Sequence, residues 1–354
     1  KIPDVVDRPI LRASGPADIV QLVPYLLGFH PNDSVVLIAM RGRRIVVSVR
    51  NDLDAPIELV VPLCITATRA GADRVVALLY ADGISGPPLP RQRYVDELRA
   101  LFAEHGLEEV DIIAVSDGRW WSYRCSDPRC CAPDGTPIET SGVTAATAVA
   151  EGLVALPNRE SLESELALDE LAMNVVRSEI AEFIASEYGK PEESERQIRA
   201  GDWAEVRKFV KKVRKGDSFT PKEAARVLCA LEDRSVRDAT IGYLVSRPDP
   251  DVREAWRRLT TVAPTRWRPA PATLYAMWCY ADGNGARTNV GVDVALDADP
   301  DYAMAQILLE LQMSALNPFE FLHDMAVEAE RVGRRIQRKR HPSGRQAATR
   351  SAKK

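Results

Sequence analysis

The chain changes character near residue 160, and this change constrains its fold more than any single motif. Before it, short β-branched and apolar runs alternate with segments of helical periodicity. The strand-like runs span residues 35–40, 45–49, 75–80, 110–115 and 120–124, and the helix-like segments span 16–27, 56–70, 91–105 and 143–154. Strands that alternate with helices predict a layered α/β domain with a mixed sheet, which we place at residues 1–155.

Residues 156–330 carry helical patterns without strand signals, so we expect an all-α helical domain there. Thr220-Pro-Lys-Glu223 has the residues of a helix start, with Thr220 as the N-cap and Glu223 closing a capping box. Two helical patterns joined at Asp282-Gly-Asn-Gly285, with an Asp-Pro turn at 299–300, resemble a tetratricopeptide-like helical hairpin. One such unit cannot bury its own apolar face, so we expect it to stack on neighbouring helices.

The formal net charge of −4 conceals an asymmetry along the chain. Residues 331–354 contain ten Lys and Arg residues and no acid, whereas the remainder holds 37 basic and 51 acidic residues. An acidic body with a basic tail is not the pattern of a general nucleic-acid-binding protein. We expect 331–354 to be a basic disordered tail, and contact with an acidic partner or with nucleic acid is the alternative.

The composition also bears on location. The chain is 45% apolar and 28% charged, and no apolar run approaches the ~20 residues that span a bilayer. Residues 2–12 lack the apolar segment of a signal peptide. We therefore expect a cytoplasmic protein of two domains that does not contact a membrane.

Residues 24–38 form a junction between a helix and a strand. The helical run stops at Gly28, a β-branched run starts at Val35, and His30, Asp33 and Ser34 lie between them. These are the residue types of a base, an orienting carboxylate and a nucleophile. Residues so close in sequence rarely reach the geometry of a triad, and a Gly-x-Ser-x-Gly elbow is absent. The alternative is a left-handed helix stop at Gly28 followed by a turn held by its own side chains.

Arg50 and Asp52 close the second strand-like run. The end of a strand in a mixed sheet is a usual edge for ligands, and an arginine there can hold a phosphate or carboxylate through two hydrogen bonds. The alternative is an ion pair within the domain. If Arg50 and Asp52 converge with His30, Asp33 and Ser34, they form a candidate ligand-binding site.

Three of the six cysteines cluster as Cys125, Cys130 and Cys131. Zinc sites usually use four ligands with Cys-x2–4-Cys spacing, and this cluster offers three sulfurs in the spacing Cys-x4-Cys-Cys. Inert structural thiols, a redox pair and a zinc site all remain open. We expect no cofactor, with zinc at these three cysteines as the alternative.

Four segments together resemble a known family. They are residues 16–52, with Pro24-Tyr-Leu-Leu-Gly-Phe-His-Pro31; Cys125-Ser-Asp-Pro-Arg-Cys-Cys131 with Gly135; the alanine-rich stretch after Ser141; and the stretch from Pro271 to Tyr302. They occur in the order found in the family called domain of unknown function 4192, and the resemblance covers about residues 10–317. It implies a cytosolic actinobacterial protein, and it implies no activity because the family has none assigned.

The sequence thus predicts a non-enzymatic interaction or regulatory protein. The chain has no Walker loop, Gly-x-Gly-x-x-Gly, His-Glu-x-x-His or calcium-loop pattern. Stacked helices offer a surface for an unidentified protein partner. The alternative is a small-molecule-binding protein or hydrolase with its site at residues 28–34 and 50–52, and nucleic-acid contact through the tail is a weaker one.

Overall fold

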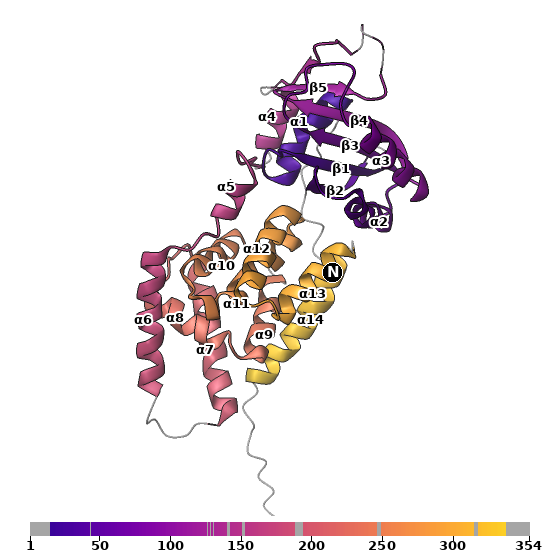
Figure 1. Cartoon of the computed structure of the whole chain (residues 1–354). Helices are drawn as coiled ribbons and strands as arrows, with labels where there is room; N and C mark the ends of the chain where they lie inside the picture. Colours follow the sequence, from indigo (N-terminus) through magenta and orange to yellow (C-terminus); the bar gives the residue numbers. More distant parts are fainter. Residues whose placement is uncertain are drawn as a thin grey trace, which may run out of the picture.

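The computed structural model describes residues 15–42, 44–125, 127, 129, 131–139, 142–150, 153–187, 194–245, 249–314 and 318–337. A sheet domain lies at one end of the molecule and a helical domain at the other, and the short helix α5 (Arg159–Ser164) lies between them (Figure 1). The predicted fold class, a mixed-sheet α/β half followed by an all-helical half, is confirmed.

The sheet has six strands among the described residues, in the order β2-β1-β3-β4-β5-β6. Strands β3 and β4 are parallel, joined by the crossover helix α3, and every other neighbouring pair is antiparallel. The bounds are β1 Ser34–Arg41, β2 Arg44–Asp52, β3 Arg74–Tyr80, β4 Glu108–Ser116, β5 Arg119–Ser122 and β6 Thr136–Pro137. The two-residue strand β6 is not among the strands that the sequence predicts.

Helices cover both faces of this sheet, which explains why its central strands are apolar throughout. On one face, Val36, Leu78 and Ile113 pack in a core with α1 (Pro16–Leu27). On the other, residues of alternating position such as Leu37 and Ile112 pack with α2 (Val61–Arg69) and α3 (Gln92–Glu104). A single turn of 3-10 helix, η1 (Ile57–Val60), precedes α2, and α4 (Val143–Ala150) lies beside α1.

Both tryptophans of β5, Trp120 and Trp121, are buried. Trp120 packs on the α1 side, as strand alternation requires for one of the two. Trp121 points to the opposite face, and its indole N–H donates to the carbonyl of Pro133 at 3.0 Å. The loop after β5 therefore covers the ring that alternation alone would leave exposed.

The described part of residues 156–330, where the sequence predicts an all-helical domain, contains a series of helices. Asn158 caps the short α5, and α6 begins separately at Glu170. The predicted capping box at Thr220 and Glu223 is present. The bounds are α6 Glu170–Glu187, α7 Glu195–Val213, α8 Pro221–Ala230, α9 Arg234–Val245, α10 Pro250–Val262, η2 Thr265–Trp267, α11 Pro269–Ala281, α12 Gly285–Ala298, α13 Ala303–Met313 and α14 Pro318–Gln337.

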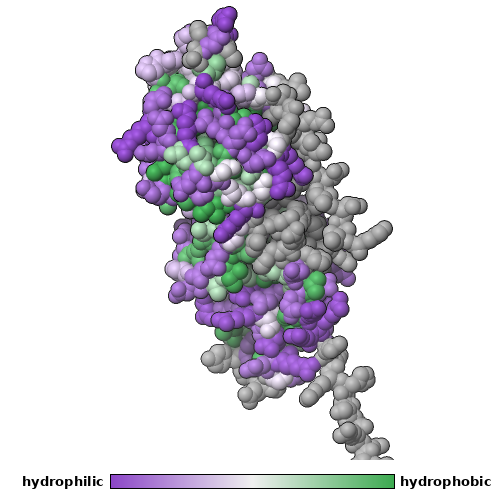
Figure 2. Space-filling view, turned by 90° about the vertical axis from the view of Figure 1, so that its right-hand side faces the viewer, coloured by the Kyte–Doolittle hydropathy of each residue, from purple (hydrophilic) through white to green (hydrophobic). Residues whose placement is uncertain are grey.

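The predicted helical hairpin joined at residues 282–285 is formed by α11 and α12, and α10 and α13 pack against it. Residues 331–337 belong to α14, so helix continues seven residues into the segment predicted to be a disordered tail. Residues 338–354 lie outside the described part of the chain. Hydrophilic residues predominate on the visible face of both domains, with hydrophobic patches among them (Figure 2). Within the described ranges, no helix is both long and apolar enough to cross a membrane.

We expect Asp202→Asn to stabilise the protein above pH 6. Burial, together with the nearby carboxylates of Asp233, Glu187 and Glu205, raises the pKa of the Asp202 carboxyl to about 6. Because the folded pKa exceeds the value near 4 of an unfolded chain, stability is greatest below pH 4 and falls as the pH rises toward 6. After allowance for partial exposure, the variant should gain about 1 kcal/mol in unfolding free energy at pH 7.5.

Urea denaturation at pH 4.5 and pH 7.5 measures this gain. The advantage of Asp202→Asn should be larger at pH 7.5, and an equal advantage at both values would contradict the assignment. Asp217→Asn, at an exposed position, should change stability by less than about 0.5 kcal/mol at either pH.

Candidate functional site

The register of the sheet brings the two predicted segments to one edge. Ser34, the first residue of β1, lies opposite Asp52, the last residue of β2, and also opposite Tyr80, the last residue of β3. Tyr80 in turn lies opposite Val115 near the end of β4. The start of β1, the end of β2 and the carboxyl ends of the parallel pair therefore meet at one edge, the usual ligand edge of such sheets.

The turn before β1 ends the first helix and holds the interdomain linker. Gly28 has φ 83° and its N–H donates to the carbonyl of Pro24, so the predicted left-handed helix stop is confirmed. The carbonyl of Gly28 accepts from the N–H of Leu156 at 2.8 Å, and the N–H of His30 donates to the carbonyl of Leu156 at 2.9 Å. These two bonds place the linker, and α5 immediately after it, beside the edge of the sheet.

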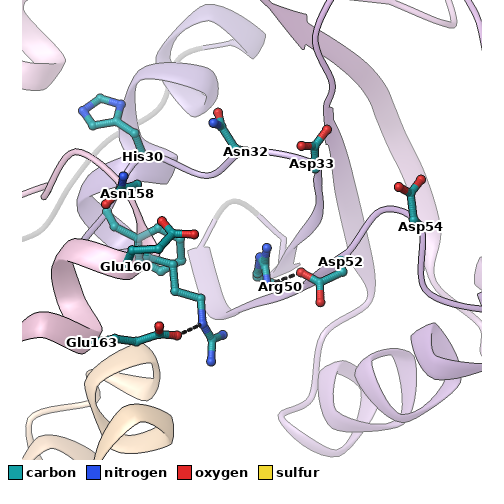
Figure 3. Close-up of a pocket in the computed structure, with 11 residues that line it drawn as sticks. His30, Asn32, Asp33, Arg50, Asp52, Asp54, Asn158, Glu160 and Glu163 are labelled. Carbon is teal, nitrogen blue, oxygen red and sulfur yellow. Dashed lines mark hydrogen bonds and ion pairs between the residues drawn. The ribbon is translucent and has the colours of Figure 1, made fainter. Parts of the chain in front are cut away.

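A pocket of about 800 Å3 lies between this edge and α5, and we call it the edge pocket (Figure 3). Four of the five residues predicted for a ligand-binding site line it, namely His30, Asp33, Arg50 and Asp52. Its other lining residues are Phe29, Asn32, Asp54, Asn158, Arg159, Glu160 and Glu163. The residues predicted from two separate segments thus converge.

Arg50 is held by its neighbours rather than left open to a ligand. Its Nε donates to Ser34 Oγ at 2.8 Å, and its Nη1 lies 2.6 Å from Asp52 Oδ1. The Ser34 hydroxyl, which is fully buried, also donates to the carbonyl of Asn32. The ion pair that the sequence offered as an alternative role for Arg50 and Asp52 is therefore present.

The three residues that suggested a triad do not form one. Ser34 Oγ contacts Asn32 and Arg50, and the His30 ring is exposed and points away from Arg50 and Asp52 (Figure 3). Asp33 has φ 39°, a left-handed conformation that Asp tolerates, and its carbonyl accepts from the N–H of Leu53 at 2.8 Å. Its backbone shapes the turn, and its carboxylate is exposed at the pocket.

Negative charge exceeds positive charge around the edge pocket. Both arginines of the lining are already in ion pairs: Arg50 with Asp52, and Arg159 with Glu163 at 2.8 Å. The remaining carboxylates of the lining are those of Asp33, Asp54 and Glu160; Asp54 pairs with Arg91 at 3.0 Å. The carboxylates of Asp33 and Glu160 have no hydrogen bond or ion pair with a described residue, so they leave the pocket with a net negative charge.

The carboxylates around the pocket are spread along its walls. Across the described ranges, no three His, Cys, Asp or Glu side chains converge as a set of metal ligands. Hard cations such as Mg2+ and Ca2+ are bound by several oxygens at one point. The arrangement suits a ligand that extends across the pocket and meets separate carboxylates.

The comparisons with known proteins bear on the chain as a whole. Residues 16–319 match the family model described as Domain of unknown function (DUF4192). The chain belongs to this family. No curated protein and no solved structure matches it. The DUF4192 match spans both domains and includes every residue that lines the edge pocket.

Sequence reasoning missed the α5 wall of this DUF4192 pocket. Asn158 accepts a hydrogen bond from the N–H of Ser161, and this Asn-x-x-Ser start was a readable sign of a short helix. Arg159, one turn before Glu163, also reaches Asp293 of α12 at 3.4 Å and so links the pocket to the helical domain. No pattern in the residues around α5 indicates that this helix lies against the edge of the sheet.

The cysteine cluster lies elsewhere. Cys125 and Cys131 are half-buried and line a second, smaller pocket, whereas Cys130 lies outside the described residues. A zinc site at these three cysteines stays a prediction.

Proposed function

We propose that this DUF4192 protein is a non-enzymatic binding protein whose edge pocket takes a small organic ligand carrying more than one positive charge. The observation that carries the proposal is the excess of carboxylates in a pocket of about 800 Å3 whose two arginines are already paired. That volume lies within the range of small-molecule sites. Positive charges on the ligand would compensate the negative charges of Asp33 and Glu160.

The distribution of charge supports an organic polyamine-like cation over a metal ion. Asp33 lies in the turn before β1, Asp54 follows β2, and Glu160 lies on α5, so the three carboxylates come from three parts of the chain. Ammonium groups separated by short alkyl chains can each approach one carboxylate while the alkyl chain contacts Phe29. A single ion cannot reach groups that do not converge.

The lining favours binding over covalent catalysis. The described lining contains no serine, threonine, cysteine or lysine, and we assign its carboxylates to the charge of the ligand rather than to nucleophilic attack. Ser34, the predicted nucleophile, is buried behind Arg50. The residues of the earlier hydrolase alternative thus serve to shape and charge the pocket.

Spermidine is the probe that tests this proposal. Calorimetric titration should detect binding to the wild-type chain, and affinity should fall as salt is raised because the contacts are between charges. Each carboxylate near a cationic nitrogen contributes about 1 kcal/mol at 4 Å in water. The double variant Asp33→Asn/Glu160→Gln should therefore weaken binding about tenfold or more.

The matched control removes two charges elsewhere. Glu182→Gln/Asp217→Asn changes the net charge equally at exposed positions of the helical domain, and it should leave spermidine binding within about twofold of wild type. If both double variants lose affinity equally, binding is non-specific and the proposal fails. Equal binding of glycerol, a neutral probe, would also contradict it.

Two other expectations stay predictions. A partner surface on the helical domain draws support from exposed apolar side chains on the outer side of α6, where Leu171 is 83% exposed. Contact through the basic tail concerns residues 338–354, which lie outside the described ranges, and residues 331–337 at the end of α14.

A further inference from the structure

The second half of α7 carries a run of basic residues that the function proposed above does not use. Residues 207–215 read Arg-Lys-Phe-Val-Lys-Lys-Val-Arg-Lys, so six of these nine residues are basic and none is acidic. The run lies in the helical domain, away from the edge pocket (Figure 1). It is a local concentration of positive charge on a body that is acidic overall.

Helical periodicity places three of these lysines on one side of α7, and we call them the lysine row. Lys208, Lys211 and Lys215 are spaced by three and four residues, the spacing of neighbours on a helix surface. The N–H of Lys215 donates to the carbonyl of Lys212 at 3.0 Å, so the turn continues past the last residue of the helix. All three residues are exposed, and the row therefore faces solvent.

The described part of the chain does not neutralise the lysine row. None of its three lysines makes a hydrogen bond or ion pair with a described residue. Glu223 accepts hydrogen bonds from Lys212 at 2.9 and 2.8 Å, and Glu205 pairs with Arg226 at 3.9 Å, so these acids are engaged with other bases. Asp217, two residues after the row, carries the nearest carboxylate in sequence that is not paired in this way.

Helix stability does not account for the lysine row. Like charges three or four residues apart repel each other and destabilise a helix. Lysines stabilise a helix near its carboxyl end, but this dipole effect falls off within the last turn. Lys208 lies five residues before Val213, where α7 ends, so it gains little from the dipole. An anion that approaches the row from outside would relieve the repulsion.

The length of the row suits a chain of phosphates. A helix rises 1.5 Å per residue, so the row extends over about 10 Å of the axis of α7. Duplex nucleic acid carries one negative charge per about 1.7 Å of its own axis. Each ammonium group of the row can therefore approach a different phosphate of one duplex.

The surroundings of the row do not suit a lipid surface. Helices that bind membranes carry large apolar side chains beside their basic residues. On α7, the exposed positions that continue the row toward the amino end are Gln197, Gly201 and Ala204, and none of them is large and apolar. Ile198, which is 51% exposed, lies ten residues before Lys208, about 15 Å along the helix.

The aromatic residues of α7 favour a duplex over a single strand. Proteins that bind single strands stack the bases on exposed aromatic rings. Trp203 and Phe209 of α7 are both buried, so this helix offers no ring for stacking. We propose that the lysine row binds the phosphate backbone of duplex nucleic acid without reading its bases. The contact is ionic and independent of the edge pocket.

Fluorescence anisotropy of a labelled DNA duplex, titrated with the native full-length chain, tests the proposal. The wild-type chain should bind, and its affinity should fall as NaCl rises from about 50 to about 150 mM, because binding releases counterions. Each lysine that contacts a phosphate contributes about 0.9 to the slope of log affinity against log salt. Lys208→Gln/Lys211→Gln should therefore reduce this slope by about 2 and weaken binding about tenfold or more at the lower salt.

The matched control removes two positive charges from the sheet domain. Arg69→Gln/Arg93→Gln, at exposed positions on α2 and α3, should leave duplex binding within about twofold of wild type. Thermal unfolding followed by circular dichroism checks that the lysine variant is folded. This variant should unfold at or above the wild-type temperature, because charges that repel each other have been removed.

The proposal fails if the wild-type chain does not bind the duplex, if the lysine variant binds it as the wild type does, or if both double variants lose affinity equally. Vesicles of equal parts phosphatidylcholine and phosphatidylserine provide the membrane comparison. Stronger binding to these vesicles than to the duplex would identify a lipid surface and overturn the proposal. A single-stranded oligonucleotide of the same length should bind more weakly, because its charges are more widely spaced, and the reverse order would also contradict the assignment.

Discussion

Trp256→Ala should lower the unfolding free energy of the helical domain by about 3–5 kcal/mol. Trp256, on α10, is completely buried and is the largest such side chain among the described residues. Its ring lies 5.5 Å from that of Phe209 on α7, which in turn lies 5.3 Å from that of Phe219. Truncation removes an indole from a site where helices α6, α7 and α11 all contact α10, so the cavity cannot close without moving several helices.

Guanidinium denaturation followed by circular dichroism measures this loss. Trp256→Phe is the informative control, because it keeps an aromatic ring and removes an indole N–H that has no hydrogen-bond partner in the described part of the chain. It should lose less than half as much stability as the alanine variant. Equal losses for Phe and Ala would mean that the ring does not hold the helices together.

The strands of the sheet could be predicted because the pattern of each strand lies within one short segment of the sequence. The run from Val75 to Tyr80 is too short for a buried helix and too apolar for an exposed strand, so a strand covered on both faces follows. Gly28 was recognisable as a helix stop because only a residue without a Cβ readily takes φ 83°. Each of these inferences needs only the residues in one segment.

The site could be predicted only in part because its second wall is not local. The segments that carry His30 and Arg50 reach one pocket through β1–β2 pairing, which the sequence implied by a short link between two strand-like runs. The approach of Glu160 depends on two backbone hydrogen bonds between Gly28–His30 and Leu156, more than 120 positions apart in sequence. Backbone bonds of this kind carry no residue signature.

The burial of Trp121 was also not predictable, because it depends on a loop that comes later in the sequence. Alternation along β5 correctly places Trp120 and Trp121 on opposite faces, but it cannot say that a later loop returns to one of them. The signal was Gly135, whose missing Cβ admits the indole, and a single glycine in a loop does not name its neighbour.

Replacement of glycine by alanine should have opposite effects at two helical positions. At Gly291, on α12, a Cβ would lie 2.8 Å from that of Ala276 and 3.1 Å from the carbonyl oxygen of Ala272, both on α11. At Gly201, on α7, no atom lies within 4 Å of the added carbon. Alanine favours a helix over glycine by about 1 kcal/mol, so intrinsic propensity predicts stabilisation at both sites.

We expect helix propensity to determine the change in stability at Gly201, and packing against α11 to determine it at Gly291. Gly201→Ala should gain about 0.5–1 kcal/mol. Gly291→Ala should lose about 1 kcal/mol and Gly291→Val about 3 kcal/mol, because the backbone of α11 cannot yield as a flexible side chain can. Thermal unfolding of the three variants measures these differences, and stabilisation by Gly291→Ala would show that the two helices can separate without loss.

The close contact between α11 and α12 at Gly291 should also affect the edge pocket. α12 carries Asp293, which pairs with Arg159 of the pocket lining at 3.4 Å. If Gly291→Val displaces α12, this pair should loosen and spermidine binding should weaken even though no residue of the lining has changed. Gly201→Ala, at a position where no atom lies within 4 Å of the added carbon, should leave spermidine binding at the wild-type value.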